Sequence, residues 1–212
     1  CHATVLDYRN RLISADYPGY AKATVKEALG DETVVMFTNG ACGDINPGGY
    51  SADISAIGGF IPGRTFRRAK RLGSILGKEV LRVVKGIETH SLVNLSVMTE
   101  RVHLPLREFL SPSDAEGQIN EKEALVRRLK RQGASEKKIT EAKIAAVYTK
   151  IELSHAKKAA LLPKGEIEAE LQAIALNDTL IIGLPGEIFV QIGLNLKNGS
   201  RFNHTFVIGY AN

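Results

Sequence analysis

The stretch Glu166–Glu187 (EIEAELQAIALNDTLIIGLPGE) predicts the centre of the fold. Its first half alternates glutamate or glutamine with apolar residues, which is the pattern of a half-buried β-strand. Asn177 and Asp178 form a turn signal, and Thr179–Leu184 is a short apolar run typical of a buried strand. This hairpin makes part of the sheet antiparallel, while strands and helices alternate elsewhere. We therefore predict an α/β fold with a mixed sheet flanked by helices.

The flanking sequence predicts the other elements of this fold. Asp16 is suited to cap the first helix, and Gly30 is suited to end it. Apolar residues recur at helical spacing from Phe66 to Ile87. The predicted helices cover 16–29, 66–87 and about 188–196, the other predicted strands cover 33–38, 91–107 and 206–210, and a long glycine-rich loop covers 47–63.

Residues 111–163 differ in composition from the rest of the chain and predict a charged helical hairpin. Ser113 and Glu116 make a capping box before the first helix, and Gly133 separates it from the second. Each helix has only a narrow apolar stripe, so we expect the pair to lie on the surface or to project from it. We therefore predict a single domain over 1–212, with the hairpin at 111–163 as an insertion.

Most of the basic excess lies in this hairpin. The formal net charge is +5, and Lys and Arg are concentrated at 122–164, where they are interleaved with Glu. A basic binding module for nucleic acid is one interpretation of such a patch. However, the charges alternate in sign, Trp is absent and aromatic residues make up 6% of the chain. We therefore expect a solvated helical face and no nucleic-acid partner, with the basic binding module as the alternative.

The overall composition is that of an ordinary globular protein. The 212 residues are 44% hydrophobic and 24% charged. No run of about 18 apolar residues is present, so no membrane span is predicted, and contact with a membrane surface stays open. No secretory signal pattern is visible, and the sequence does not indicate a compartment. The chain begins with Cys1 and not with Met, so we expect that an upstream segment is missing.

The sequence contains two cysteines, Cys1 and Cys42, which are too few for a disulfide framework. They could pair with each other, or both could be buried thiols. A third interpretation makes Cys1 an N-terminal nucleophile whose own α-amine acts as the base.

Polar side chains gather in the segment Asn39–Pro47, which follows the predicted strand at 33–38. This glycine-rich segment carries a thiol, a carboxylate and two amides. Within it, Asp44 either positions a ligand by hydrogen bonding or closes an Asx-turn on its own loop. Glu187 follows the predicted strand Thr179–Leu184. It is either a plain first-turn residue of the next helix, or a metal ligand or base in the crevice at the strand ends.

His2 is either a metal ligand or an ordinary surface or core histidine. The spacings HExxH and CxxC are absent from the sequence, so any metal site must combine distant parts of the chain. The remaining histidines are isolated in the sequence, and they are His90, His103, His155 and His204.

Five segments occur in an order that resembles one family. They are Cys1-His2, Leu12–Tyr20, Asn39–Pro47, Leu184–Glu187 and Phe206–Asn212. In these segments the chain resembles the catalytic domain of the neutral/alkaline (non-lysosomal) ceramidase family, and more closely its uncharacterised prokaryotic members. The resemblance covers the ends of the chain well and the charged hairpin poorly.

This resemblance implies a zinc-dependent amidase that cleaves the N-acyl bond of ceramide, a small lipid amide, into a sphingoid base and a fatty acid. In the family, two His, one Glu and one Tyr hold the zinc. His2 matches the second of these histidines, and Glu187 matches the Glu. The first His is expected upstream of Cys1 and the Tyr downstream of Asn212. We therefore expect two of four zinc ligands in this chain, and weak zinc binding without the missing flanking segments.

The chain departs from the family within the Asn39–Pro47 segment. The family motif Gly-Asp-Val-Ser-Pro, with a serine implicated in catalysis, reads Gly43-Asp44-Ile45-Asn46-Pro47 here. Asn46 has no hydroxyl that could accept an acyl group. Either a zinc-bound water attacks, with Asn46 helping to hold the oxyanion and Asp44 positioning a ligand, or the protein acts on another amide or ester, or is not catalytic. Asn46 and Asp44 are thus the candidate catalytic residues.

Overall fold

The computed structural model describes residues 1–7, 9–48, 51–89, 91–162 and 165–211. His90, Asn212 and the Pro163 end of the predicted hairpin lie outside the described residues. The chain divides into two compact units. The first unit comprises Cys1–Tyr50, Pro62–Val102 and Ala169–Asn212, and the second comprises Ser51–Ile61 and His103–Glu168.

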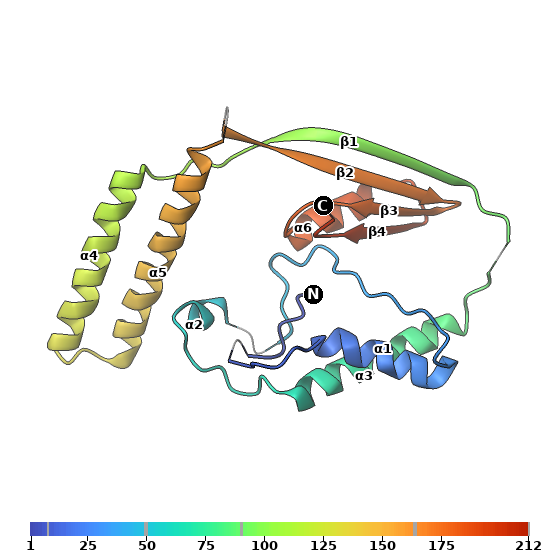
Figure 1. The fold of residues 1–212 in the computed structure, drawn as a ribbon, viewed down its shortest axis with the longest axis horizontal. Helices are drawn as coiled ribbons and strands as arrows, with labels where there is room; N and C mark the ends of the chain where they lie inside the picture. The colour runs from blue at the N-terminus through green and yellow to red at the C-terminus, as the bar shows by residue number, and fades with distance from the viewer. Residues whose placement is uncertain (8, 49–50, 90, 163–164, 212) are drawn as a thin grey trace. The chain divides into compact units, whose positions relative to one another are not determined.

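The described residues form an α/β fold with a four-stranded mixed sheet, as predicted (Figure 1). The strands lie in the order β1 (Leu95–Pro105), β2 (Glu166–Leu176), β3 (Thr179–Gly183) and β4 (His204–Ile208). β2 and β3 form the antiparallel hairpin that the Asn177–Asp178 turn predicted. β3 and β4 are parallel, and helix α6 (Val190–Gly199) supplies the crossover that a parallel pair needs.

β1 pairs with β2 at one edge of this sheet. The Asn177 amide donates to the Asn94 carbonyl at 3.0 Å, and the Leu106 amide donates to the Gly165 carbonyl at 2.9 Å, so the two strands run antiparallel. Apolar residues alternate along β1 as the sequence indicated, but Leu95 and Val97 are 63% and 64% exposed. Alternation therefore predicted the strand correctly without predicting burial of its apolar face.

Helices α1 (Asp16–Leu29) and α3 (Phe66–Val84) pack against each other in the first unit. Small residues of α3 permit this approach. A Cβ atom at Gly73 would lie 2.5 Å from the Tyr20 Cβ, and one at Gly77 would lie 2.7 Å from the Thr24 Cβ. The buried cluster beside this crossing comprises Val5, Tyr17 and Ala69.

The second unit contains the helical hairpin, formed by α4 (Pro112–Arg131) and α5 (Glu136–Ala159), and the short helix α2 (Ala52–Ala56), which contacts α5. Small side chains fill the space between the helices, and the buried ones are Ala115, Ala142, Ala146 and Ala156. That residues 111–163 are an insertion in a single domain stays a prediction. No helix among the described residues is long and apolar enough to cross a membrane.

The prediction of a buried strand at 33–38 is wrong. The segment pairs with no strand in the described structure, and Val34 and Met36 are each 85% exposed. Phe37 packs edge-on against Tyr17, with 5.7 Å between the ring centroids. Asn39, the residue after this segment, is bonded to the chain next to β4, because its carbonyl accepts from the Gly209 amide at 3.0 Å. A run of apolar β-formers does not by itself secure a ladder partner.

Two helix starts also differ from prediction. The loop predicted over 47–63 contains α2, which begins where Ser51 Oγ accepts from the Ile54 amide at 3.3 Å. Helix α4 begins two residues earlier than the predicted capping box, because Ser111 and not Ser113 is its N-cap. Ser111 Oγ accepts from the Asp114 amide at 3.1 Å, and Pro112 occupies the first turn, where its missing N–H costs nothing.

The predicted cap of α1 is wrong in its geometry. Asp16 is the first residue of the helix and has a φ of +50°, while the N-cap Ala15 has no side chain that can accept a hydrogen bond. The buried Asp16 carboxylate instead accepts from the Leu6 amide at 2.8 Å and from the Tyr17 amide at 2.6 Å. Asp16 therefore fastens the N-terminal segment to α1.

Candidate metal centre

Three polar side chains from distant parts of the sequence meet in the first unit. The Tyr210 hydroxyl donates to Glu187 Oε1 at 2.7 Å. The oxygen of that hydroxyl also lies 3.0 Å from His2 Nε2. His2 Nε2 lies 3.7 Å from Glu187 Oε1. The imidazole and the phenol ring meet edge to face, with centroids 6.3 Å apart. The structure thus brings the two predicted ligands, His2 and Glu187, to one place and adds Tyr210.

The parallel pair of β3 and β4 explains why Glu187 and Tyr210 lie together. The two strands end at the same edge of the sheet, which is where α/β folds place their ligand sites. Gly186 has a φ of +80° and Tyr210 a φ of +58°, so the chain turns sharply at both positions. The Tyr210 amide donates to the Gly186 carbonyl at 3.0 Å, which holds the two turns against each other.

The N-terminal segment brings His2 to this edge. The His2 amide donates to the Ile45 carbonyl at 3.1 Å, and Tyr17 Oη donates to the Cys1 carbonyl at 2.7 Å. Arg64 Nη2 donates to the Thr4 carbonyl at 3.0 Å and to the Leu6 carbonyl at 2.6 Å. These bonds, together with the Asp16 bond to the Leu6 amide, fix the segment on both sides of His2.

The hydrogen bond at Nδ1 of His2 determines what its other nitrogen can do. Nδ1 lies 3.1 Å from the Ile45 carbonyl, which can only accept, so Nδ1 carries a proton. In the neutral imidazole, Nε2 then carries a lone pair directed at the Tyr210 hydroxyl. A backbone carbonyl bonded to Nδ1 is the usual support for a histidine that binds a metal through Nε2.

The one hydroxyl proton of Tyr210 can serve only one of the two neighbours of that hydroxyl, Glu187 and His2. The single hydroxyl proton of Tyr210 is directed at Glu187, which leaves His2 Nε2 facing an oxygen with no proton between them. A carboxylate, a phenol oxygen and an imidazole lone pair therefore converge. Such a group of acceptors suits a cation, which is why the cluster is a candidate metal centre.

The donors fit zinc in type, and His2 and Glu187 also fit it in spacing, whereas the two Tyr210 contacts have hydrogen-bond lengths of 2.7 and 3.0 Å. Nitrogen from His and oxygen from Glu are common zinc ligands, and two ligands at about 2.1 Å from a tetrahedral zinc lie about 3.4 Å apart. The separation of His2 Nε2 and Glu187 Oε1, 3.7 Å, is close to that value. The His2 side chain is 16% exposed and that of Glu187 is 59% exposed, so one side of the cluster is open. No cluster of three or more His, Cys, Asp and Glu that could hold a metal occurs in the described part of the chain, and the third donor here is a tyrosine.

The surroundings keep the Tyr210 hydroxyl protonated in the metal-free protein. Desolvation of the hydroxyl raises the pKa of Tyr210, and the hydrogen bond to Glu187 raises it further. Tyr210 is therefore a phenol that donates to Glu187, and a cation held here would compete with its proton.

The Asn39–Pro47 segment packs against the segment that carries Glu187. The Gly43 amide donates to the Ile188 carbonyl at 2.9 Å, and a Cβ atom at Gly43 would lie 2.5 Å from the Glu187 carbonyl oxygen. Asp44 Oδ1 accepts from the Val190 amide at 2.8 Å, at the first residue of α6. The Asp44 side chain thus orients the Glu187 segment through the start of α6.

Asn46 lies beside the N-terminal segment. Its Oδ1 accepts from Thr4 Oγ1 at 3.0 Å, so the side-chain NH₂ is the group left to donate elsewhere.

The two cysteines are neither bonded to each other nor both buried, which were two of the predictions made for them. Both are free thiols, and Cys42 is fully buried while Cys1 is exposed.

Tyr210 is the site residue that sequence reasoning missed. The resemblance placed the family tyrosine beyond Asn212, although Tyr210 directly follows the predicted strand at 206–210. Its position after a strand parallel to the one before Glu187 was the available signal. The other described histidines lie elsewhere: His103 pairs with Glu166 at 3.7 Å, and His155 stacks edge-on with Phe109.

Comparison with protein-family models, with curated proteins and with solved structures found no match for this chain. Function must therefore be inferred from the chemistry of the cluster and from the sequence resemblance.

Proposed function

We propose that this chain carries the site of a zinc-dependent hydrolase of the neutral-ceramidase type, which cleaves the N-acyl amide bond of ceramide or of a related lipid amide. The observation that carries the proposal is the convergence of His2, Glu187 and Tyr210 within 2.7 to 3.7 Å of one another. The sequence left His2 and Glu187 open as metal ligands, the resemblance paired them, and these residues are 185 positions apart in the sequence.

His2 Nε2, Glu187 Oε1 and Tyr210 Oη would hold the metal. When bound, zinc polarises a substrate carbonyl and lowers the pKa of a bound water towards about 7. The Ile45 carbonyl keeps the His2 ring in the orientation and tautomer that binding requires. Asp44 and the Gly43 contact restrain the chain at Glu187, so that its carboxylate is positioned before the substrate arrives.

The side-chain NH₂ of Asn46 would donate a hydrogen bond to the substrate. Its Oδ1 is held by Thr4, which orients the NH₂ group and leaves its protons for an acceptor. A fixed amide N–H stabilises the negative charge that develops on a carbonyl oxygen during attack by water. This role requires no hydroxyl at position 46, so it is compatible with the loss of the family serine.

One observation favours a second candidate. The chain has Asn46 where the family has the serine implicated in catalysis, so a relative that acts on another amide or ester, or that has lost catalysis, is the alternative. Assays with ceramide, with a simple N-acyl amide and with an ester separate these cases. Turnover of ceramide would exclude the alternative, and turnover of only the ester would replace the proposed substrate.

Metal analysis of the protein with its native flanking segments tests the site. We expect one zinc per chain, and loss of most of it in His2→Ala and in Glu187→Ala. His204→Ala is the matched control, because His204 is exposed at the other end of β4 and should leave the zinc content unchanged. Full occupancy in both site variants would refute the assignment of the ligands.

A further inference from the structure

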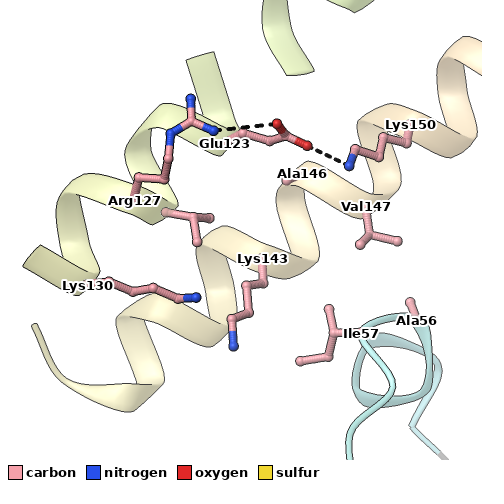
Figure 2. Close-up of a pocket in the computed structure, with 10 residues that line it drawn as sticks. Ala56, Ile57, Glu123, Arg127, Lys130, Lys143, Ala146, Val147 and Lys150 are labelled. Carbon is pink, nitrogen blue, oxygen red and sulfur yellow. Dashed lines mark ion pairs between the residues drawn. The ribbon is translucent and has the colours of Figure 1, made fainter. Parts of the chain in front are cut away.

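The second unit contains a cavity of about 440 Å³ that the proposed hydrolase site does not use. Residues of α4, α5 and the end of α2 line it (Figure 2). Its volume falls within the range of about 300–1,000 Å³ that small-molecule sites occupy.

One part of the lining is apolar. Ile57 and Ala56 close one side, and Val126, Ala146 and Val147 come from the hairpin helices. The α2 side is held in place by a hydrogen bond from Tyr148 Oη to Asp53 Oδ1 at 2.8 Å. This apolar surface is suited to aliphatic carbon atoms and not to a chain of phosphates.

The other part of the lining is cationic, and its charges are unequally compensated. Glu123 lies 2.6 Å from Lys150 Nζ and 3.7 Å from Arg127 Nη1, so those two cations share one carboxylate. Lys130 and Lys143 have no anionic partner among the described residues. In Figure 2 they reach from facing helices, α4 and α5, towards the same end of the cavity.

We infer that this cavity binds a small amphiphilic carboxylate, with its acyl chain on the apolar lining and its head group between Lys130 and Lys143. Two ammonium groups supply the charge-assisted hydrogen bonds that a carboxylate needs. The lining carries four cations and one carboxylate, so it attracts anions of either charge, and its apolar part is what favours an acyl carboxylate. The combination of an apolar lining and two uncompensated lysines distinguishes this cavity from a solvated basic face.

Binding of octanoate to the full protein tests the inference, with the heat of binding as the measurement. Acetate carries the head group alone, and octanol carries the chain alone. We expect octanoate to bind at least about tenfold more tightly than either, because only octanoate uses both parts of the cavity. Octanol that binds as tightly as octanoate would overturn the role of the lysines.

A pair of double variants locates the site. Lys130→Gln with Lys143→Gln removes the two uncompensated charges, and we expect octanoate binding to weaken by about tenfold. Lys137→Gln with Lys138→Gln makes the same change of net charge on α5 outside the cavity, and should leave binding within about twofold. Glutamine keeps helix propensity, so both double variants retain the hairpin.

Two results would replace the inference. Equal weakening in both double variants would indicate a diffuse attraction to basic charge. Binding to vesicles of phosphatidylglycerol and phosphatidylcholine without binding of free octanoate would indicate a lipid surface as the partner.

Discussion

Tyr210 and Glu187 are joined by a hydrogen bond of 2.7 Å from the phenol hydroxyl to Oε1 of the carboxylate. The bond links the ends of two neighbouring parallel strands, and its oxygen atom on Tyr210 also faces His2 Nε2 at 3.0 Å. The hydroxyl therefore lies at the centre of the candidate metal site, and its removal is the most direct change to make there.

Tyr210→Phe removes one oxygen donor while keeping the ring. We expect zinc affinity to fall by at least about tenfold, because the loss of a residue that only supports a metal ligand already costs about 10–100-fold. The measurement is competition for zinc with a chromophoric chelator. Tyr148→Phe is the matched control, because it removes a hydroxyl bonded to Asp53 in the second unit. Unchanged affinity in Tyr210→Phe would remove Tyr210 from the site and leave His2 and Glu187 to be tested separately.

Asp44→Ala removes the acceptor that the first amide of α6 uses. The N-cap Phe189 offers no side-chain hydrogen bond, so the Val190 amide loses its only side-chain acceptor among the described residues. We expect a loss of about 1 kcal/mol in the free energy of unfolding, as for other lost helix caps. Urea unfolding followed by circular dichroism measures it. Asp44→Asn keeps an acceptor and should recover most of the loss, whereas equal losses in both variants would contradict a capping role.

Gly73→Ala tests the crossing of α1 and α3. The added methyl would lie 2.5 Å from the Tyr20 Cβ, so the helices must separate or shift, and overpacking of this kind costs about 1–3 kcal/mol. Gly117→Ala, within α4, is the control, because nothing lies within 4 Å of the added Cβ. That change should be neutral or stabilise by up to about 1 kcal/mol. Thermal unfolding that ranks the two variants in the opposite order would disprove the close crossing.

Asp16→Ala tests how the N-terminal segment is held. It leaves the Leu6 and Tyr17 amides without the buried carboxylate, and an unsatisfied buried donor costs about 1–3 kcal/mol. We also expect weaker zinc binding, because the same segment carries His2. Asp16→Asn keeps one acceptor and tolerates the positive φ, so its losses should be smaller. Normal zinc affinity in Asp16→Ala would show that the metal site does not depend on this anchor.

Sequence periodicity predicted the sheet hairpin and the long helices well, because these elements are determined by local pattern. The Asn177–Asp178 turn and the apolar run after it led to the antiparallel pair of β2 and β3. The strand at 33–38 failed, because pairing depends on a neighbouring strand that local sequence does not specify. The caps of α1 and α4 shifted, because several Ser and Asp residues near a helix start can each take the role.

The candidate site was only partly predictable for a similar reason. His2 and Glu187 came from the resemblance, and no spacing in the sequence relates them. Tyr210 reaches them because β3 and β4 are parallel and because the chain turns with positive φ after each strand, at Gly186 and at Tyr210. That geometry depends on the crossover through α6, which a helical pattern at about 188–196 indicates without fixing the side of the sheet.

Glu152→Gln tests the pH dependence of the second unit. Arg107 donates two hydrogen bonds to Glu152, at 3.0 and 2.5 Å, and these lower the pKa of Glu152 below its ordinary value of 4.5. A carboxylate whose pKa is lower in the folded state stabilises that state above the unfolded pKa, and the stabilisation is lost as the pH falls through the lowered pKa. The midpoint of thermal unfolding of the hairpin should therefore fall less between pH 7 and pH 3 in Glu152→Gln than in the unmodified protein.

Glu141→Gln is the control, because Glu141 lies on the same helix without an ion pair among the described residues. Its unfolding midpoint should fall as much as that of the unmodified protein. An identical pH profile in Glu152→Gln and the unmodified protein would show that the Arg107 pair is too solvated to contribute.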